Sequence, residues 1–182
     1  MRSYGWRRLD TPGLELATWR PRADGALLQG RVLVVEGGSH LSVDYRIEVD
    51  GRWVTRLVDV DVVADGHPAA LRLEHDGAGG WRRDGRPDSA LERCLDVDLQ
   101  VTPLTNALPV NRLRLAGDGA AAEILAAWVH FPGLSVNAAP QRYQRLAPTT
   151  YRYTSLDSGF TAQVEMDENG FPIIYEGLWQ RA

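Results

Sequence analysis

The 182-residue sequence predicts a single all-β domain, a strongly curved antiparallel sheet or half-barrel of about eleven to twelve short strands. Three observations support this fold class. Apolar and polar residues alternate with a period of two in most segments, as they do in strands with one buried face. Turn residues recur roughly every 8–12 residues, which is typical of sandwiches and barrels. No linker, internal repeat or low-complexity tract divides residues 1–182, so we expect one domain.

The first half of the chain carries the clearest alternation. Residues 14–20 and 27–36 read as two strands, and residues 41–49 then alternate without a break. Asp50-Gly51 is a strong hairpin signal. In the following strand, residues 53–63, the side chains of Val58, Val60 and Val62 share one face.

Further strands are expected along the rest of the chain, each bounded by turn residues. Residues 89–94 have a capping serine but span barely one helical turn. Residues 102–110 and 137–148 are proline-containing and are expected to be ordered loops, with a new strand carrying Arg112 and Arg114. We therefore expect no helix longer than about three turns. The remaining predicted strands are residues 70–74, 81–83, 95–101, 119–131, 151–155, 160–166 and 171–175.

Composition excludes several classes of protein. A single cysteine forms neither an internal disulfide nor a cysteine-type zinc site. Acidic residues outnumber basic ones by 24 to 20, which gives no reason to expect nucleic acid as a partner. All the basic residues are arginine, so lysine chemistry is absent. No apolar run approaches a membrane span, and residues 1–10 lack the apolar core of a signal peptide. We expect a cytoplasmic protein without cofactor or metal.

The sequence contains no recognisable nucleophile motif, phosphate-binding loop or metal motif. The best acid–base candidates are Asp96 and Asp98, which alternate with Leu95, Val97 and Leu99 and therefore share one face of a strand, about 7 Å apart. The alternative is that both simply face water. If Asp96 is enclosed, it needs a partner such as Arg112, Arg114 or the loop that carries Thr105 and Asn106, because an unpaired buried carboxylate is costly. Cys94 has no adjacent base and is expected to be a buried structural thiol.

A polar ligand site is predicted around the same strand. Asp96, Asp98, Thr105 and Asn106 could hydrogen-bond sugar hydroxyls, and Arg112 could pair with a phosphate or a carboxylate. Aromatic side chains with a polar tip suit the rim of a ligand groove. Those expected there are Trp53, Trp81, Trp128, Tyr151 and Tyr153.

An ordered set of short motifs resembles the bacterial family named "putative glycolipid-binding", over residues 14–181. The most specific block is residues 94–109. The resemblance implies a curved, partly closed β-sheet similar to that of envelope lipoprotein carriers, which hold acyl chains in an apolar concavity. It also implies no established catalysis. The motifs are Asp76-Gly77, Trp81, Asp84-Gly85, and residues 94–99 (CLDVDL), 102–109 (TPLTNALP), 151–153 (YRY), 158–160 (SGF) and 175–179 (YEGLW).

The sequence thus predicts non-catalytic binding of an amphipathic ligand, a glycolipid or another lipid-like small molecule, in the concave face of the sheet. One alternative is a small hydrolase or isomerase that uses Asp96 and Asp98 as an acid–base pair. A second is a protein-interaction module that pairs through an exposed edge strand. A binder should show an apolar cavity with a polar mouth, an enzyme a small cleft with converging carboxylates, and a module neither. If the chain's own side chains fill the concave face, the hypothesis of binding there fails and the interaction module takes its place.

Overall fold

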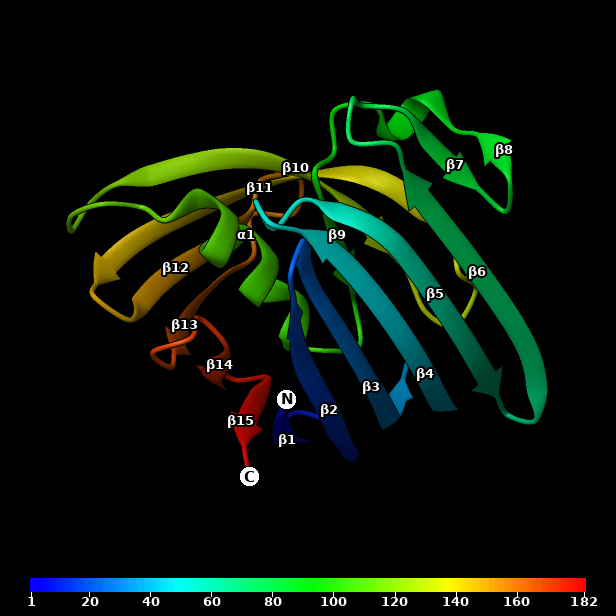
Figure 1. Ribbon diagram of the computed structural model, residues 1–182. Helices are drawn as coiled ribbons and strands as arrows, with labels where there is room; N and C mark the ends of the chain where they lie inside the picture. Colours follow the sequence, from blue (N-terminus) through cyan, green and yellow to red (C-terminus); the bar gives the residue numbers. More distant parts are fainter.

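A computed structural model describes all residues 1–182 and shows an all-β protein with one open, strongly curved sheet (Figure 1). The sheet has fifteen strands, and the helical elements are η1 (Ser89–Leu91), η2 (Leu104–Asn106) and α1 (Ala107–Leu113). None of these helices is long and apolar enough to cross a membrane. The strands are β1 (Arg2–Arg8), β2 (Gly13–Arg22), β3 (Gly25–Glu36), β4 (Ser39–Asp50), β5 (Thr55–Ala64), β6 (His67–His75), β7 (Trp81–Arg83), β8 (Arg86–Pro87), β9 (Asp96–Leu99), β10 (Ala121–Val129), β11 (Val136–Ala147), β12 (Thr150–Ser155), β13 (Thr161–Met166), β14 (Pro172–Tyr175) and β15 (Trp179–Arg181).

The strand order is β8-β7-β6-β5-β4-β3-β2-β1-β15-β14-β13-β12-β11-β10-β9. Every neighbouring pair is antiparallel except β9 and β10, which run parallel. Pairing of β1 with β15 joins the two halves of the chain and brings the two termini close together (Figure 1). The sheet curls until the chain at β9 reaches β5, where the Thr55 amide donates to the Leu95 carbonyl at 2.9 Å. The sheet therefore wraps around a central space, with β9 and α1 inside.

The alternation predicted from the sequence determines which side chains face that space. Val43 and Ile47 on β4 and Val58 on β5 are completely buried, whereas their neighbours on the outer face are partly or fully exposed. Strand parity alone accounts for this because successive side chains point to opposite faces.

The end of β9 and the chain segment that follows it, η2 and α1, fill the inner face of the sheet. Leu99, Leu104 and Leu108 have no exposed surface and belong to the same 33-residue core cluster as Val43 and Val58. The concave face, which the sequence analysis assigned to a ligand, is thus occupied by the chain itself. The reason is that η2 and α1 present a continuous apolar surface that the alternating strands bury. The prediction that a ligand binds in the concave face is therefore wrong, and the open grooves near this segment lie at the rim of the space.

The secondary structure corrects three expectations. Residues 137–148 are not a loop, because β11 pairs with β10 over residues 136–144 and with β12 over residues 141–147, and these ladders outweigh the weak strand propensity of its Asn, Ala and Pro residues. Residues 104–113 form η2 and α1, so Arg112 lies on a helix and not on the predicted strand. Pro109 is tolerated there because it occupies the first turn, where no backbone N–H partner is needed. The short strands β1, β8 and β15 raise the count to fifteen, above the eleven to twelve expected.

The helix limit and the choice of a strand for residues 119–131 are confirmed. The longest helix, α1, has seven residues, and β10 occupies Ala121–Val129. The buried Ala127 and Val129 alternate with the half-buried Trp128, which shows that the period-two pattern prevailed over the helix-compatible alanines.

One charged side chain lies inside the core on the β1–β5 side. Glu15 on β2 is 1% exposed and accepts hydrogen bonds from the Tyr45 hydroxyl and from Thr102 Oγ1, the latter at 2.7 and 2.8 Å. The Tyr45 ring crosses the backbone of Gly30 to reach it, leaving no room there for a Cβ atom. Burial raises the pKa of the Glu15 carboxyl to about 7, although both hydrogen bonds act in the opposite direction.

This buried carboxyl is expected to make stability depend on pH. Because the pKa of Glu15 is higher in the folded than in the unfolded state, the folded state binds the proton more tightly. The resulting stabilisation is complete below pH 4.5 and is lost as pH rises to about 7. Between pH 4.5 and 8, the wild type should lose about 3 kcal/mol relative to Glu15→Gln in urea denaturation. Parallel pH profiles for the two proteins would contradict this prediction.

Candidate ligand-binding site

Asp96 and Arg112 form a buried ion pair at the centre of the predicted site. The side chain of Asp96 is 1% exposed and that of Arg112 15%. Arg112 donates from Nη2 to Oδ2 at 2.6 Å and from Nε to Oδ1 at 3.0 Å. This two-point contact fixes the plane of the guanidinium group. The expectation that an enclosed Asp96 pairs with an arginine is therefore confirmed, and α1 supplies the partner.

Asp98 lies two residues further along β9 and is also satisfied internally. Its Oδ1 accepts from Thr105 Oγ1 at 3.0 Å and its Oδ2 from Gln141 Nε2 at 2.7 Å. Burial raises the pKa of Asp98, and the two hydrogen bonds only partly offset that effect. Asp98 thus ties β9 to η2 on one side and to β11 on the other. Its contacts are those of a structural carboxyl.

Asn106 and two of the predicted tyrosines belong to the same interior. Asn106 Oδ1 accepts from the Tyr143 hydroxyl at 2.9 Å, and Tyr143 packs edge-on against Tyr153 with ring centroids 5.5 Å apart. Tyr153 and Tyr151 are each 8% exposed and join a second, smaller core cluster that includes Val110 of α1. These side chains hold the underside of η2 and α1 against β11–β13.

The three predicted tryptophans do not converge. Trp81 is 2% exposed, stacks on His75 and donates to the Cys94 carbonyl at 3.0 Å. Trp128 is half-buried beside His130, with ring centroids 3.8 Å apart. Trp53 lies elsewhere, in the β4–β5 hairpin. Of these three, only Trp53 lines a groove that also contains Arg112.

Two open grooves meet at Arg112. The first, here called the arginine groove, has a volume of about 850 Å³, and four of its lining side chains are arginines: Arg52, Arg93, Arg112 and Arg114. The second, the apolar groove, has a volume of about 400 Å³. Arg93, Leu95 and Arg112 line both grooves and form the wall between them. The remaining lining of the apolar groove consists of one acidic residue, Glu123, and of Leu113, Ile124, Leu125, Pro140 and Leu156.

The β4–β5 hairpin positions one side of the arginine groove, close to α1 (Figure 1). Asp50 Oδ1 accepts from the amides of Arg52 and Val54 at 2.8 and 3.0 Å, which closes the turn. Trp53 then adopts φ 64°, a left-handed conformation that is uncommon for a non-glycine residue. This turn brings the Trp53 ring against Trp19 and Phe171, at centroid distances of 6.4 and 6.3 Å.

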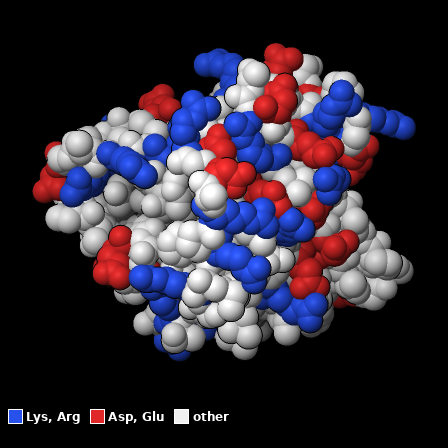
Figure 2. Space-filling model, in the orientation of Figure 1, with Lys and Arg blue, Asp and Glu red and all other residues white.

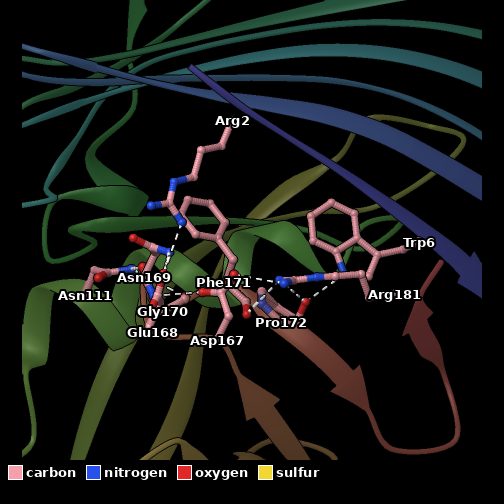
Figure 3. A network of polar contacts seen from close by, with 10 residues as sticks. All are labelled: Arg2, Trp6, Asn111, Asp167, Glu168, Asn169, Gly170, Phe171, Pro172 and Arg181. Carbon is pink, nitrogen blue, oxygen red and sulfur yellow. Dashed lines mark hydrogen bonds and ion pairs between the residues drawn. The ribbon is translucent and has the colours of Figure 1, made fainter.

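The end of α1 positions the other side. Arg114 caps the helix in the left-handed conformation, φ 45°, and its Nε donates to the Asn111 carbonyl at 3.3 Å. Asn111 Nδ2 donates to the Ala107 carbonyl at 2.9 Å and to the Asn169 carbonyl at 3.2 Å (Figure 3). Asn111 therefore links α1 to the turn between β13 and β14.

That turn is anchored on both sides (Figure 3). Asp167 Oδ1 accepts from the amides of Asn169 and Phe171, while its Oδ2 pairs with Arg181 at 2.9 Å. Arg181 also donates to the carbonyls of Phe171 and Pro172 at 3.0 and 2.6 Å. These contacts hold the Phe171 ring, which has no exposed surface, inside the molecule beneath Trp53. These hydrogen bonds and the ion pair therefore fix the β13–β14 turn and the position of Phe171 beneath the arginine groove.

Sequence reasoning missed most of the groove residues. Arg52 follows the Asp50-Gly51 turn and Arg93 precedes the block of residues 94–99, but neither arginine carried a functional signal of its own, and Leu113, Ile124 and Leu156 lie on different segments. The sequence signal that pointed to this place was Arg112 together with Arg114. Of the predicted residues, Trp53 and Arg112 line these grooves, whereas Asp96, Asp98, Thr105 and Asn106 lie beneath them.

A third groove, about 1060 Å³, crosses the outer face of β1–β7. Its charged residues are largely paired with each other, for example Arg31 with Asp44 and Arg72 with Asp59, each at 2.7 Å. Figure 2 likewise shows acidic and basic side chains interleaved on one face of the molecule, over the region of β5–β8. With its charges compensated, this surface offers a ligand less than the arginine groove does.

No cluster of His, Cys, Asp or Glu side chains is arranged to hold a metal ion. Cys94 is fully buried, and burial raises the pKa of its thiol to about 12, so the thiol stays protonated at neutral pH.

Comparison with known proteins supports the resemblance inferred from the sequence. No curated protein matches the chain. Among solved structures, a DUF1089 family protein from Pseudomonas aeruginosa is 36% identical, with 92% of each chain covered and a TM-score of 0.81. A family described as "Putative glycolipid-binding" matches residues 3–181. Because that match spans nearly the whole chain, the protein belongs to this "Putative glycolipid-binding" family.

Proposed function

We propose that the protein binds an amphipathic small molecule, a glycolipid or another lipid-like ligand, without chemical turnover. The ligand lies across the arginine groove and the apolar groove at the rim of the sheet. The observation that carries this proposal is the shared wall of Arg93, Leu95 and Arg112, because it places a polar and an apolar compartment side by side. The family description supports a ligand of this class.

The apolar groove suits a short stretch of hydrocarbon. Leu95 and Leu156 are large aliphatic side chains that line the same hollow and are 37% and 41% exposed to water. Covering them with a ligand chain removes apolar surface from water, and this contributes about 0.8 kcal/mol per buried methylene. The volume of about 400 Å³ is within the usual range for small-molecule sites.

The enzyme alternative is less well supported. A general acid or base must reach the reacting atoms, yet neither Asp96 nor Asp98 lines either groove. Asp96 is already paired with Arg112, and both oxygens of Asp98 have partners. These two carboxyl groups stabilise the interior and do not converge on a cleft.

The interaction-module alternative is less well supported at the sheet edges. β8 has two residues, one of them proline, and β9 is buried on both faces. A different surface supports this alternative. Leu14, Leu33 and Val63 form a row on the outer face and are 61%, 53% and 44% exposed. Leu33→Ser in sedimentation velocity tests whether that row mediates self-association.

Binding should be detectable with a dodecyl-chain amphiphile kept below its critical micelle concentration, with a dissociation constant of ~1–100 μM. The emission of Trp53 should shift as the arginine groove fills, and Trp53→Phe should abolish the shift, because Trp53 is the only tryptophan that lines either groove. Replacing both Leu95 and Leu156 by Ser should weaken binding about tenfold in calorimetry.

The matched control is Leu9→Ser, which removes a leucine that is 45% exposed and lines neither the arginine groove nor the apolar groove. It should leave the dissociation constant unchanged. Equal losses in Leu9→Ser and in the double variant would show that the amphiphile binds nonspecifically, and that outcome would overturn the proposed site.

A further inference from the structure

The arginine groove contains more positive charge than its surroundings neutralise. Glu92 is the one acidic residue among its lining side chains. Behind the lining, Asp96 pairs with Arg112, and Asp50 pairs with Arg56 at 2.9 Å and with Arg52 at 4.0 Å. Neither Arg93 nor Arg114 has a carboxylate within 4.0 Å, so neither forms an ion pair within the protein.

The guanidinium group of Arg112 is held in a fixed position from which it can bind a ligand. Asp96 occupies its Nε and Nη2, so the guanidinium is held at the junction of the two grooves. Its Nη1 makes no hydrogen bond within the protein and keeps some exposure to solvent. A fixed guanidinium with one free edge loses little conformational freedom when it binds an oxyanion.

A structural role for these arginines explains only part of the arrangement. Basic residues near the C-terminal end of a helix offset the partial negative charge of its carbonyls, and Arg112 and Arg114 meet that description in α1. Arg52 comes from the β4–β5 hairpin and Arg93 from the segment after η1, and neither belongs to the helix. Side chains from three separate elements thus direct positive charge to one groove.

Building on the proposed function, we propose that the headgroup of the ligand is an oxyanion, a phosphate or a carboxylate, rather than a neutral sugar. The headgroup binds in the arginine groove against Arg93, Arg112 and Arg114. The attached chain crosses the wall at Leu95 into the apolar groove. Planar guanidinium groups match the oxygens of phosphate and carboxylate in pairs, and a hydrogen bond that involves an ionised group is stronger than a neutral one.

The test compares headgroups on one chain length. Dodecyl phosphate, dodecanoate and dodecyl glucoside are titrated calorimetrically below their critical micelle concentrations, at low and at high salt. At least one anionic probe should bind about tenfold or more tightly than the glucoside, and that advantage should shrink as salt screens the charges. Because Arg93 and Arg114 are exposed, the double variant Arg93→Ala/Arg114→Ala should retain its melting temperature. It should lose this tenfold advantage, so that the anionic probes and the glucoside bind with similar affinities.

Two controls separate the possible results. Arg31→Ala removes an exposed arginine of the outer face and should not alter binding of any probe. Inorganic phosphate should compete with dodecyl phosphate for this site, but its dissociation constant should be far higher than that of dodecyl phosphate. If inorganic phosphate binds as tightly, the ligand is a soluble phosphorylated compound and the lipid headgroup assignment is wrong. If the glucoside binds as tightly as both anions, the headgroup proposal fails while the proposed function stands. If no probe binds, the proposed function itself is overturned.

Discussion

Replacing Asp96 by alanine is expected to lower the free energy of unfolding by about 3–5 kcal/mol. The substitution leaves the Arg112 guanidinium, 15% exposed, without the carboxylate that it contacts through two nitrogen atoms. A charge that stays enclosed without its counter-ion is far more costly than the loss of a surface pair. Urea denaturation monitored by circular dichroism measures the change.

The control for this variant is Asp44→Ala. Asp44 pairs with Arg31 on the outer face, where the two side chains are 46% and 65% exposed, so its removal should cost less than about 1 kcal/mol. The double variant Asp96→Leu/Arg112→Met should recover much of the loss, because it leaves no unpaired charge. If Asp96→Ala unfolds at the same urea concentration as Asp44→Ala, the carboxylate is solvated and the buried-pair interpretation is wrong.

Phe171→Ala should be comparably destabilising, by about 3–5 kcal/mol. The ring has no exposed surface, stacks on Tyr4 with centroids 4.6 Å apart, and packs at a tilt against Trp19 with centroids 5.3 Å apart. The surrounding turn is held by Asp167 and Arg181 (Figure 3), so the backbone cannot easily collapse into the cavity left by the substitution. A cavity that persists places the cost toward the upper end of this range.

Phe160→Ala provides the matched comparison. Phe160 is 43% exposed and packs against Tyr153 at the surface, so its truncation should cost less than about 1 kcal/mol. Phe171→Leu should retain much of the stability because it keeps most of the volume. Near-ultraviolet circular dichroism of Phe171→Ala should also change, since Trp19 and Trp53 both lie against this ring. Equal stability losses at positions 160 and 171 would contradict the assignment of Phe171 as a core anchor.

These two variants also separate stability from binding. Asp96 fixes Arg112 for a headgroup, so Asp96→Leu/Arg112→Met should weaken binding of dodecyl phosphate even where stability is largely restored. Phe171 lies beneath the arginine groove and lines neither compartment. Phe171→Leu should therefore leave binding close to that of the wild type.

The sequence by itself determined the local structure wherever one strong physical signal was present. Alternation in β4 and β5 fixed which side chains are buried, because strand geometry gives successive residues opposite faces. Turn residues such as Asp50-Gly51 marked the hairpins. The sequence left open whether Asp96 is enclosed, but the cost of an unpaired buried carboxylate predicted that an enclosed Asp96 would have a polar partner, and Arg112 is that partner.

Only the tertiary structure decided where a ligand could bind. The sequence placed the site in the concave face, but η2 and α1 fill that space, and nothing local in residues 102–113 predicted that they would fold inward as helices. The arginine groove unites a hairpin, a loop and a helix end, and the apolar groove unites α1, β10 and β11 with isolated loop residues. Strand β11 likewise formed because partners on both sides paired with a weakly encoded segment. In each case the deciding contacts join residues far apart in the chain, and their energies depend on how the sheet curls rather than on any local pattern.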